Sequence, residues 1–90
     1  MKPYKKSDYA YSVQIDLHGQ TVDSARRLLT QRLKNLDRNV REVVVLHGFN
    51  SGTALRDMVR RYKNPKIERK IIGLNQGETI FLLYSETSRK

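Results

Sequence analysis

The chain has 90 residues, of which 38% are hydrophobic, and it contains no cysteine. This length suits one small domain, and the lack of cysteine excludes a disulfide framework and a thiolate zinc site. No apolar run approaches the roughly 20 residues of a membrane span. The N-terminus is polar and lacks the apolar segment of a secretory signal, so we expect a cytoplasmic protein with no membrane contact.

The charge is strongly positive: 18 Lys and Arg oppose nine Asp and Glu, which leaves a net charge of +9. An excess of this size favours a polyanionic partner, because cationic side chains release counterions when they neutralise phosphates. We therefore expect RNA, DNA or a ribosome as the partner. The sequence leaves the oligomeric state open.

Three regions follow one another along the chain. Residues 1–10 are predicted to be a basic flexible tail, in which Lys5 and Lys6 contact phosphates or simply fray with the terminus. Residues 11–85 are predicted to form the domain, and residues 86–90 a second tail.

The domain begins with an alternation of apolar and polar residues from Val13 to His18, as in a half-buried strand. Thr21 is then a plausible N-cap of a helix that ends near Arg38, with Asn39 as its stop signal. The apolar run "VVVL" at 43–46 predicts an interior parallel strand. A second helix is predicted from Ala54 to Tyr62, followed by strands over 67–74 and 79–84.

The predicted order β-α-β-α-β-β places the chain in the α/β class, as an α+β two-layer sandwich. Both β-α-β crossovers should be right-handed, which puts the two helices on one face of a four-stranded mixed sheet. The final strand, "TIFLLY", is the most apolar, so it should lie inside the sheet rather than at an edge. The resulting strand order is 1-2-4-3.

The chain has two histidines, and both precede a glycine at the end of a predicted strand, in "VQIDLHG" and "VVVLHG". Because these strands are predicted to be parallel neighbours, His18 and His47 should meet at the edge where both helices begin. Asp16 lies on the same strand face as His18 and is suited to accept a proton from an imidazole and fix its tautomer. The expected chemistry is phosphodiester cleavage by Asp16, His18 and His47, with one ring as base and the other as acid.

Helix N-termini and glycines at this edge also predict a phosphate site, although the glycines would equally serve as turn residues. The predicted phosphate ligands are Gly19, Gly48, Asn50, Gly52 and Arg56. Beyond them, a basic surface is expected to contact the nucleic-acid backbone without reading sequence, through Arg60, Arg61, Lys63, Lys66, Arg69 and Lys70.

Two of these motifs resemble a known family. "IDLHGQTVDSA" is similar to the signature that opens Smr (small MutS-related) domains, and "VVVLHGFNSGTALRDMV" resembles their second signature, a strand that ends in His-Gly-x-Gly. "NQGETIFLL" resembles their glycine-led last strand. The resemblance implies a two-layer fold similar to the C-terminal domain of a bacterial initiation factor. It also implies nucleic-acid binding and endonuclease activity. Members of the family are associated with DNA nicking, RNA cleavage and ribosome quality control.

Carried over by position, the resemblance assigns Asp16, His18 and Gly19 to the first motif, and His47 and Gly48 to the second. The chain departs from the family where Gly48-Phe49-Asn50 stands in place of the frequent Gly-Lys-Gly. The sequence leaves open whether this departure abolishes catalysis.

The sequence leaves two main functions open, and a domain that binds a phosphate ligand or another protein is a third, weaker one. The first is an endonuclease, with RNA slightly preferred over DNA because RNA supplies its own 2′-hydroxyl nucleophile; it needs no cofactor, while Mg²⁺ or Mn²⁺ would assist DNA cleavage. The second is a non-catalytic module that binds RNA or a ribosome through its basic face.

Overall fold

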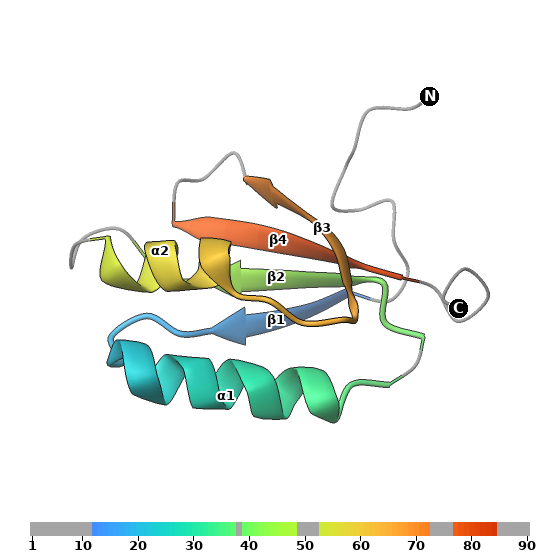
Figure 1. Cartoon of the computed structure of the whole chain (residues 1–90), viewed down its shortest axis with the longest axis horizontal. Helices are drawn as coiled ribbons and strands as arrows, with labels where there is room; N and C mark the ends of the chain where they lie inside the picture. The colour runs from blue at the N-terminus through green and yellow to red at the C-terminus, as the bar shows by residue number, and fades with distance from the viewer. Residues whose placement is uncertain (1–11, 38, 49–52, 73–76, 85–90) are drawn as a thin grey trace.

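The computed structural model describes residues 12–37, 39–48, 53–72 and 77–84 (Figure 1). In chain order it contains β1 (Ser12–Asp16), α1 (Val22–Lys34), β2 (Glu42–Leu46), α2 (Ala54–Arg61), β3 (Ile67–Ile72) and β4 (Glu78–Leu83). The predicted order of elements is therefore confirmed. The two tails, with Lys5 and Lys6, and the loop residues Asn50 and Gly52 lie outside the described residues.

The four strands form one sheet in the order β1-β2-β4-β3, as predicted (Figure 1). β1 and β2 are parallel, and Asp16 is the register partner of Leu46. β4 runs antiparallel to both of its neighbours, β2 and β3. Every residue of β4 is buried, which is why the most apolar strand occupies an interior position.

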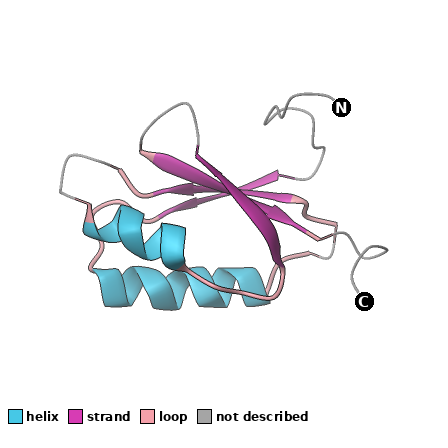
Figure 2. Cartoon of the chain, turned by 45° about the horizontal axis from the view of Figure 1, so that its top comes forward, coloured by secondary structure: helices cyan, strands magenta, loops and turns pink. Residues whose placement is uncertain are grey.

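Both helices cover the same face of the sheet, as Figure 2 shows. Side chains alternate between the two faces of a strand, so every second strand residue points toward the helices. The core between the two layers includes Ile15, Leu17, Val43, Val45, Phe81 and Leu83 from the sheet, and Ala25, Leu29, Leu33, Leu55, Met58 and Val59 from the helices. A smaller cluster on the opposite face contains Val44, Ile80 and Leu82.

The first helix begins where the sequence predicts but ends earlier. The Thr21 hydroxyl accepts a hydrogen bond from the Ser24 N–H at 3.1 Å and so acts as the N-cap. The helix ends at Lys34, with Asn35 as the C-cap, so the prediction of an end near Arg38 is wrong. The Asp37 carboxylate accepts a hydrogen bond from the Asn39 N–H at 2.8 Å, a local turn that competes with helical bonding.

No helix in the described part of the chain is long and apolar enough to cross a lipid bilayer.

Candidate active site

The two His-Gly segments meet at one edge of the sheet, beyond the carboxyl ends of β1 and β2. The parallel register aligns Asp16 with Leu46, and counting two residues onward along each chain brings His18 beside Gly48. A Cβ atom built on Gly48 would lie 3.5 Å from the Cβ of His18, which confirms the contact. Segments 30 residues apart in sequence thus form one corner.

A tight turn fixes the position of His18 at this corner. The Gln20 N–H donates to the Leu17 carbonyl at 3.2 Å, so residues 17–20 form a turn with His18 and Gly19 in the middle. Gly19 has a φ of +80°, which residues with a Cβ rarely adopt and which a type II turn requires at this place. The turn itself therefore requires a glycine at position 19, independently of any phosphate.

His18 and Asp16 form a hydrogen-bonded pair at the surface. The His18 Nδ1 lies 2.6 Å from Asp16 Oδ1, and the His18 backbone N–H donates to the same oxygen at 3.1 Å. These two bonds, the ring bond first, lower the pKa of the Asp16 carboxyl below its ordinary value. An ionised carboxylate only accepts, so Nδ1 carries the proton and the unprotonated Nε2 of the neutral ring is left for a ligand.

His47 is placed quite differently, because it is 1% exposed whereas the His18 side chain is 72% exposed. Its Nδ1 lies 3.0 Å from the Gly48 carbonyl oxygen and its Nε2 lies 2.9 Å from Thr79 Oγ1. A carbonyl oxygen only accepts, so Nδ1 is the donor and Nε2 accepts from the Thr79 hydroxyl. Burial lowers the pKa of His47, and the charges of Arg60 and Arg56 act in the same direction.

The two imidazoles consequently lie on opposite faces of the sheet edge. His47 follows the core-facing Val43 and Val45 at the same alternation, and its partner Thr79 shares that face with Phe81. His18 is bonded to Asp16 on the other face. The expected pair of imidazoles about one phosphate is therefore absent from this arrangement, in which both nitrogens of His47 are already bonded.

The backbone N–H of Gly48 is hydrogen-bonded to Gly77, the residue that precedes β4. This N–H donates to the Gly77 carbonyl at 3.0 Å, and the N–H of His47 donates to the same oxygen at 2.9 Å. With a φ of +73°, Gly48 turns the chain directly beside His18. The Gly48 N–H expected to hold a phosphate is thus bonded within the protein.

The supporting role of β4 is the part of the site that sequence reasoning missed. Gly77 and Thr79 flank the first residue of that strand and fix both residues of the second His-Gly segment. The signal was present, because Thr79 is a polar residue that opens an otherwise apolar run and must satisfy its hydroxyl when buried.

Arg56 lies in the first turn of α2, close enough to His47 for its charge to lower the pKa of that ring. Its Nη2 lies 3.3 Å from Asp57 Oδ1, a weak contact, and one third of the side chain is exposed. Its Nε also donates to that oxygen, at 3.4 Å, so the guanidinium is paired with Asp57 at the helix terminus where the sequence placed a phosphate clamp.

The predicted basic surface divides into two groups. Lys66 Nζ donates to the Leu33 carbonyl at 2.6 Å, and Lys70 Nζ donates to the carbonyls of Arg60, at 2.8 Å, and Tyr62. These two lysines thus cap the C-terminal ends of α1 and α2, where the helix dipole favours a cation. Arg61, Lys63 and Arg69 are exposed, and Arg60 is half-buried.

No group of three or more His, Cys, Asp or Glu side chains suited to a metal ion occurs among the described residues.

The chain is thus a small two-layer α+β domain in which two His-Gly segments meet at the carboxyl ends of neighbouring parallel strands. A family model described as the Smr domain matches residues 15–78, so the chain belongs to the Smr domain family. Domains of this family bind nucleic acid, and some are nucleases. No curated protein sequence matches the chain.

Among solved structures, the chain is similar to the Smr domain of Thermus thermophilus MutS2, with a TM-score of 0.71 and 24% sequence identity. The match covers 79% of this chain and 96% of that one. At this identity the likeness supports the fold, which agrees with the topology described above.

Proposed function

We propose that this domain is an endonuclease that cleaves phosphodiester bonds, preferentially in RNA, with His18 as its acid-base group. The observation that carries the proposal is the exposed His18 ring whose Nδ1 is 2.6 Å from Asp16, at the edge of a nucleic-acid-binding fold. Asp16 orients the ring and fixes its tautomer, as a carboxylate does in other imidazole-based sites.

In RNA cleavage, Nε2 of His18 would remove the proton of the 2′-hydroxyl, and the 2′-oxygen would attack the adjacent phosphorus. The bond from phosphorus to the 5′-oxygen then breaks, that oxygen takes a proton from water, and the products are a 2′,3′-cyclic phosphate and a 5′-hydroxyl. Arg56, in the first turn of α2 near the same sheet edge, is proposed as a ligand of a neighbouring phosphate rather than of the reacting one. DNA lacks this internal nucleophile, so a single exposed imidazole favours RNA.

His47 supports this site indirectly in the proposal. It ties Gly48 to Thr79 and keeps the Gly48 backbone against His18, so we assign it as a positioning residue. Mg²⁺ or Mn²⁺ would assist cleavage of DNA, which needs an activated water.

The test uses RNA and DNA of one sequence, labelled at the 5′ end, in EDTA, Mg²⁺ or Mn²⁺. We expect RNA cleavage in EDTA with cyclic phosphate ends. His18→Ala should lower the rate by roughly 10²–10⁴-fold, the usual contribution of a general base. Asp16→Asn should also lower it, and both variants should bind RNA normally by fluorescence anisotropy. Gln14→Ala, an exposed change on the same strand, is the matched control.

The alternative is a domain that binds RNA or a ribosome without cleaving it. The observation that favours it is the burial of His47, since the site then has one exposed imidazole instead of two. Salt-sensitive binding of RNA, with no cleavage in any of the three conditions, would establish this alternative and overturn the proposed nuclease.

A further inference from the structure

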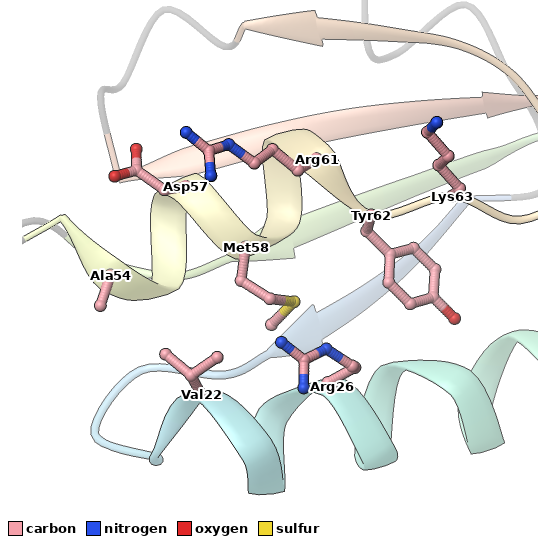
Figure 3. A pocket seen from close by; sticks show the side chains of 8 residues that line it. All are labelled: Val22, Arg26, Ala54, Asp57, Met58, Arg61, Tyr62 and Lys63. Atoms are coloured by element: carbon pink, nitrogen blue, oxygen red, sulfur yellow. The ribbon is translucent and has the colours of Figure 1, made fainter.

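A groove of about 500 Å³ lies between α1 and α2, on the outer side of the helical layer (Figure 3). It is lined by Val22, Arg26, Ala54, Asp57, Met58, Arg61, Tyr62 and Lys63. None of the acid-base residues discussed above lines it. The groove therefore needs an explanation of its own.

The far end of the groove is closed by an aromatic side chain. The Tyr62 hydroxyl lies 2.8 Å from Thr30 Oγ1, which ties the end of α2 to the middle of α1. The Tyr62 ring stacks on Phe81, with ring centroids 6.2 Å apart and an angle of 7° between the planes. Tyr62 is thus a rigid wall, and Met58 lies beside it as an apolar, polarisable surface.

The near end lies close to the proposed active site. Val22 and Ala54 are the first residues of α1 and α2, and both helices begin at the edge of the sheet that carries His18. Val22 comes only four residues after His18 in the chain. A chain molecule that occupies the groove therefore ends at the sheet edge where His18 lies, and it must pass around that edge to reach the His18 ring on the opposite face.

The rim of the groove is cationic. Arg26, Arg61 and Lys63 line it and are exposed, whereas Asp57, the one carboxylate in the lining, already contacts Arg56 at 3.3 Å. Figure 3 shows the Arg26 guanidinium extending from α1 toward Met58, into the space between the helices. Cations above an apolar and aromatic floor are the combination that binds single-stranded nucleic acid, by phosphate contacts outside and base contacts inside.

We propose that this groove binds a single-stranded segment of the nucleic acid, with Arg26, Arg61 and Lys63 on its phosphates and a base against Met58 and Tyr62. A duplex is excluded, because helices in contact have axes only about 8–10 Å apart and its paired bases cannot enter between them. The inference deepens the proposed function, since it adds to His18 a binding site for the flanking nucleotides and makes single strands the substrate.

The first experiment measures the anisotropy of a labelled RNA of about eight nucleotides at several salt concentrations. The groove variant combines Arg26→Gln, Arg61→Gln and Lys63→Gln. Its matched control, Arg27→Gln, Arg32→Gln and Lys34→Gln, removes the same charge from exposed positions of α1 that do not line the groove. Log affinity falls as log salt rises, and each phosphate contact on a single strand adds about 0.7 to the steepness of that fall. The groove variant loses three cations, so its fall should be shallower by roughly 2. Equal losses in the two variants would overturn the proposed groove.

The second experiment places a probe on the floor of the groove. The chain has two methionines, so methyl labelling of methionine gives a Met58 signal and a Met1 signal in an NMR spectrum. The Met58 signal should shift with the single-stranded RNA, saturate at the affinity found by anisotropy, and shift little with a duplex of equal length. Tight RNA binding that leaves the Met58 signal unmoved would overturn the groove.

The two proposals fail in distinguishable ways. If RNA is bound in the groove but never cleaved, the groove stands and the nuclease falls. If His18→Ala abolishes cleavage while the groove and control variants bind RNA equally, the nuclease stands and the groove falls.

Discussion

At the scale of single residues, the Asp16–His18 pair is the most informative feature of the molecule. Asp16 is the last residue of β1, and His18 lies two residues further along, in the turn that contains Gly19. This turn places His18 so that one carboxylate oxygen accepts both its ring N–H and its backbone N–H. The sequence predicted this partnership from the alternation alone, because the geometry is local. The donor of the bond follows from charge, since an ionised carboxylate accepts only.

The pair predicts a dependence of stability on pH. The hydrogen bonds from His18 lower the pKa of Asp16 in the folded chain below its unfolded value, so their contribution is present above the unfolded pKa and is lost as pH falls through the folded one. The free energy of unfolding of the wild type should therefore fall more than that of Asp16→Asn between about pH 5 and about pH 2. Urea unfolding at a series of pH values measures the difference, and parallel curves would contradict the assigned hydrogen bonds.

At the scale of elements, some basic side chains cap helices while others are exposed to solvent, and the sequence does not separate the two groups. Lys66 and Lys70 belong to the same basic stretch as Arg61, Lys63 and Arg69, yet their ammonium groups turn inward to helix carbonyls. Burial lowers the pKa of Lys70, whose Nζ also lies 5.7 Å from the centre of the Phe81 ring. Part of the net charge of +9 therefore stabilises the fold.

Replacement of Lys70 distinguishes these two groups. Lys70→Met should lower the free energy of unfolding by about 1–3 kcal/mol, because the carbonyls at the end of α2 lose a charged donor. It should leave the salt dependence of RNA binding nearly unchanged. Arg69→Met, at the exposed neighbouring position, should change the free energy of unfolding by no more than about 0.5 kcal/mol. It should, however, weaken the salt dependence of RNA binding. Urea unfolding and anisotropy check both, and a stable Lys70→Met variant would show that the lysine is dispensable to the helix.

At the scale of the whole molecule, the fold separates the two histidines that the sequence presents as a matched pair. In each motif the histidine follows a strand and precedes a glycine, but the strands are aligned so that His18 neighbours Gly48 and not His47. One residue of register decides which ring faces solvent and which faces the core.

Stability measurements should reveal this asymmetry directly. His47→Ala should lower the free energy of unfolding by about 2–4 kcal/mol, through a cavity and the lost bonds of a buried group. Thr79→Val should cost about 1–3 kcal/mol, because Nε2 of His47 is left without its donor. His18→Ala should stay within about 0.5 kcal/mol, as for an exposed side chain. Chemical denaturation measures all three, and equal effects at the two histidines would contradict their placement.

Alternation, helical spacing and caps determined the element order, the sheet order and the start of α1, because each depends on residues near in sequence or on general rules of chain connection. They also predicted that Asp16 and His18 share one face, which their hydrogen bonds confirm. The tertiary structure alone decided that His47 is bonded to Thr79, that Gly48 is bonded to Gly77, and that Lys66 and Lys70 cap helices. These outcomes depend on strand register and on packing between segments far apart in the chain, which local patterns do not specify.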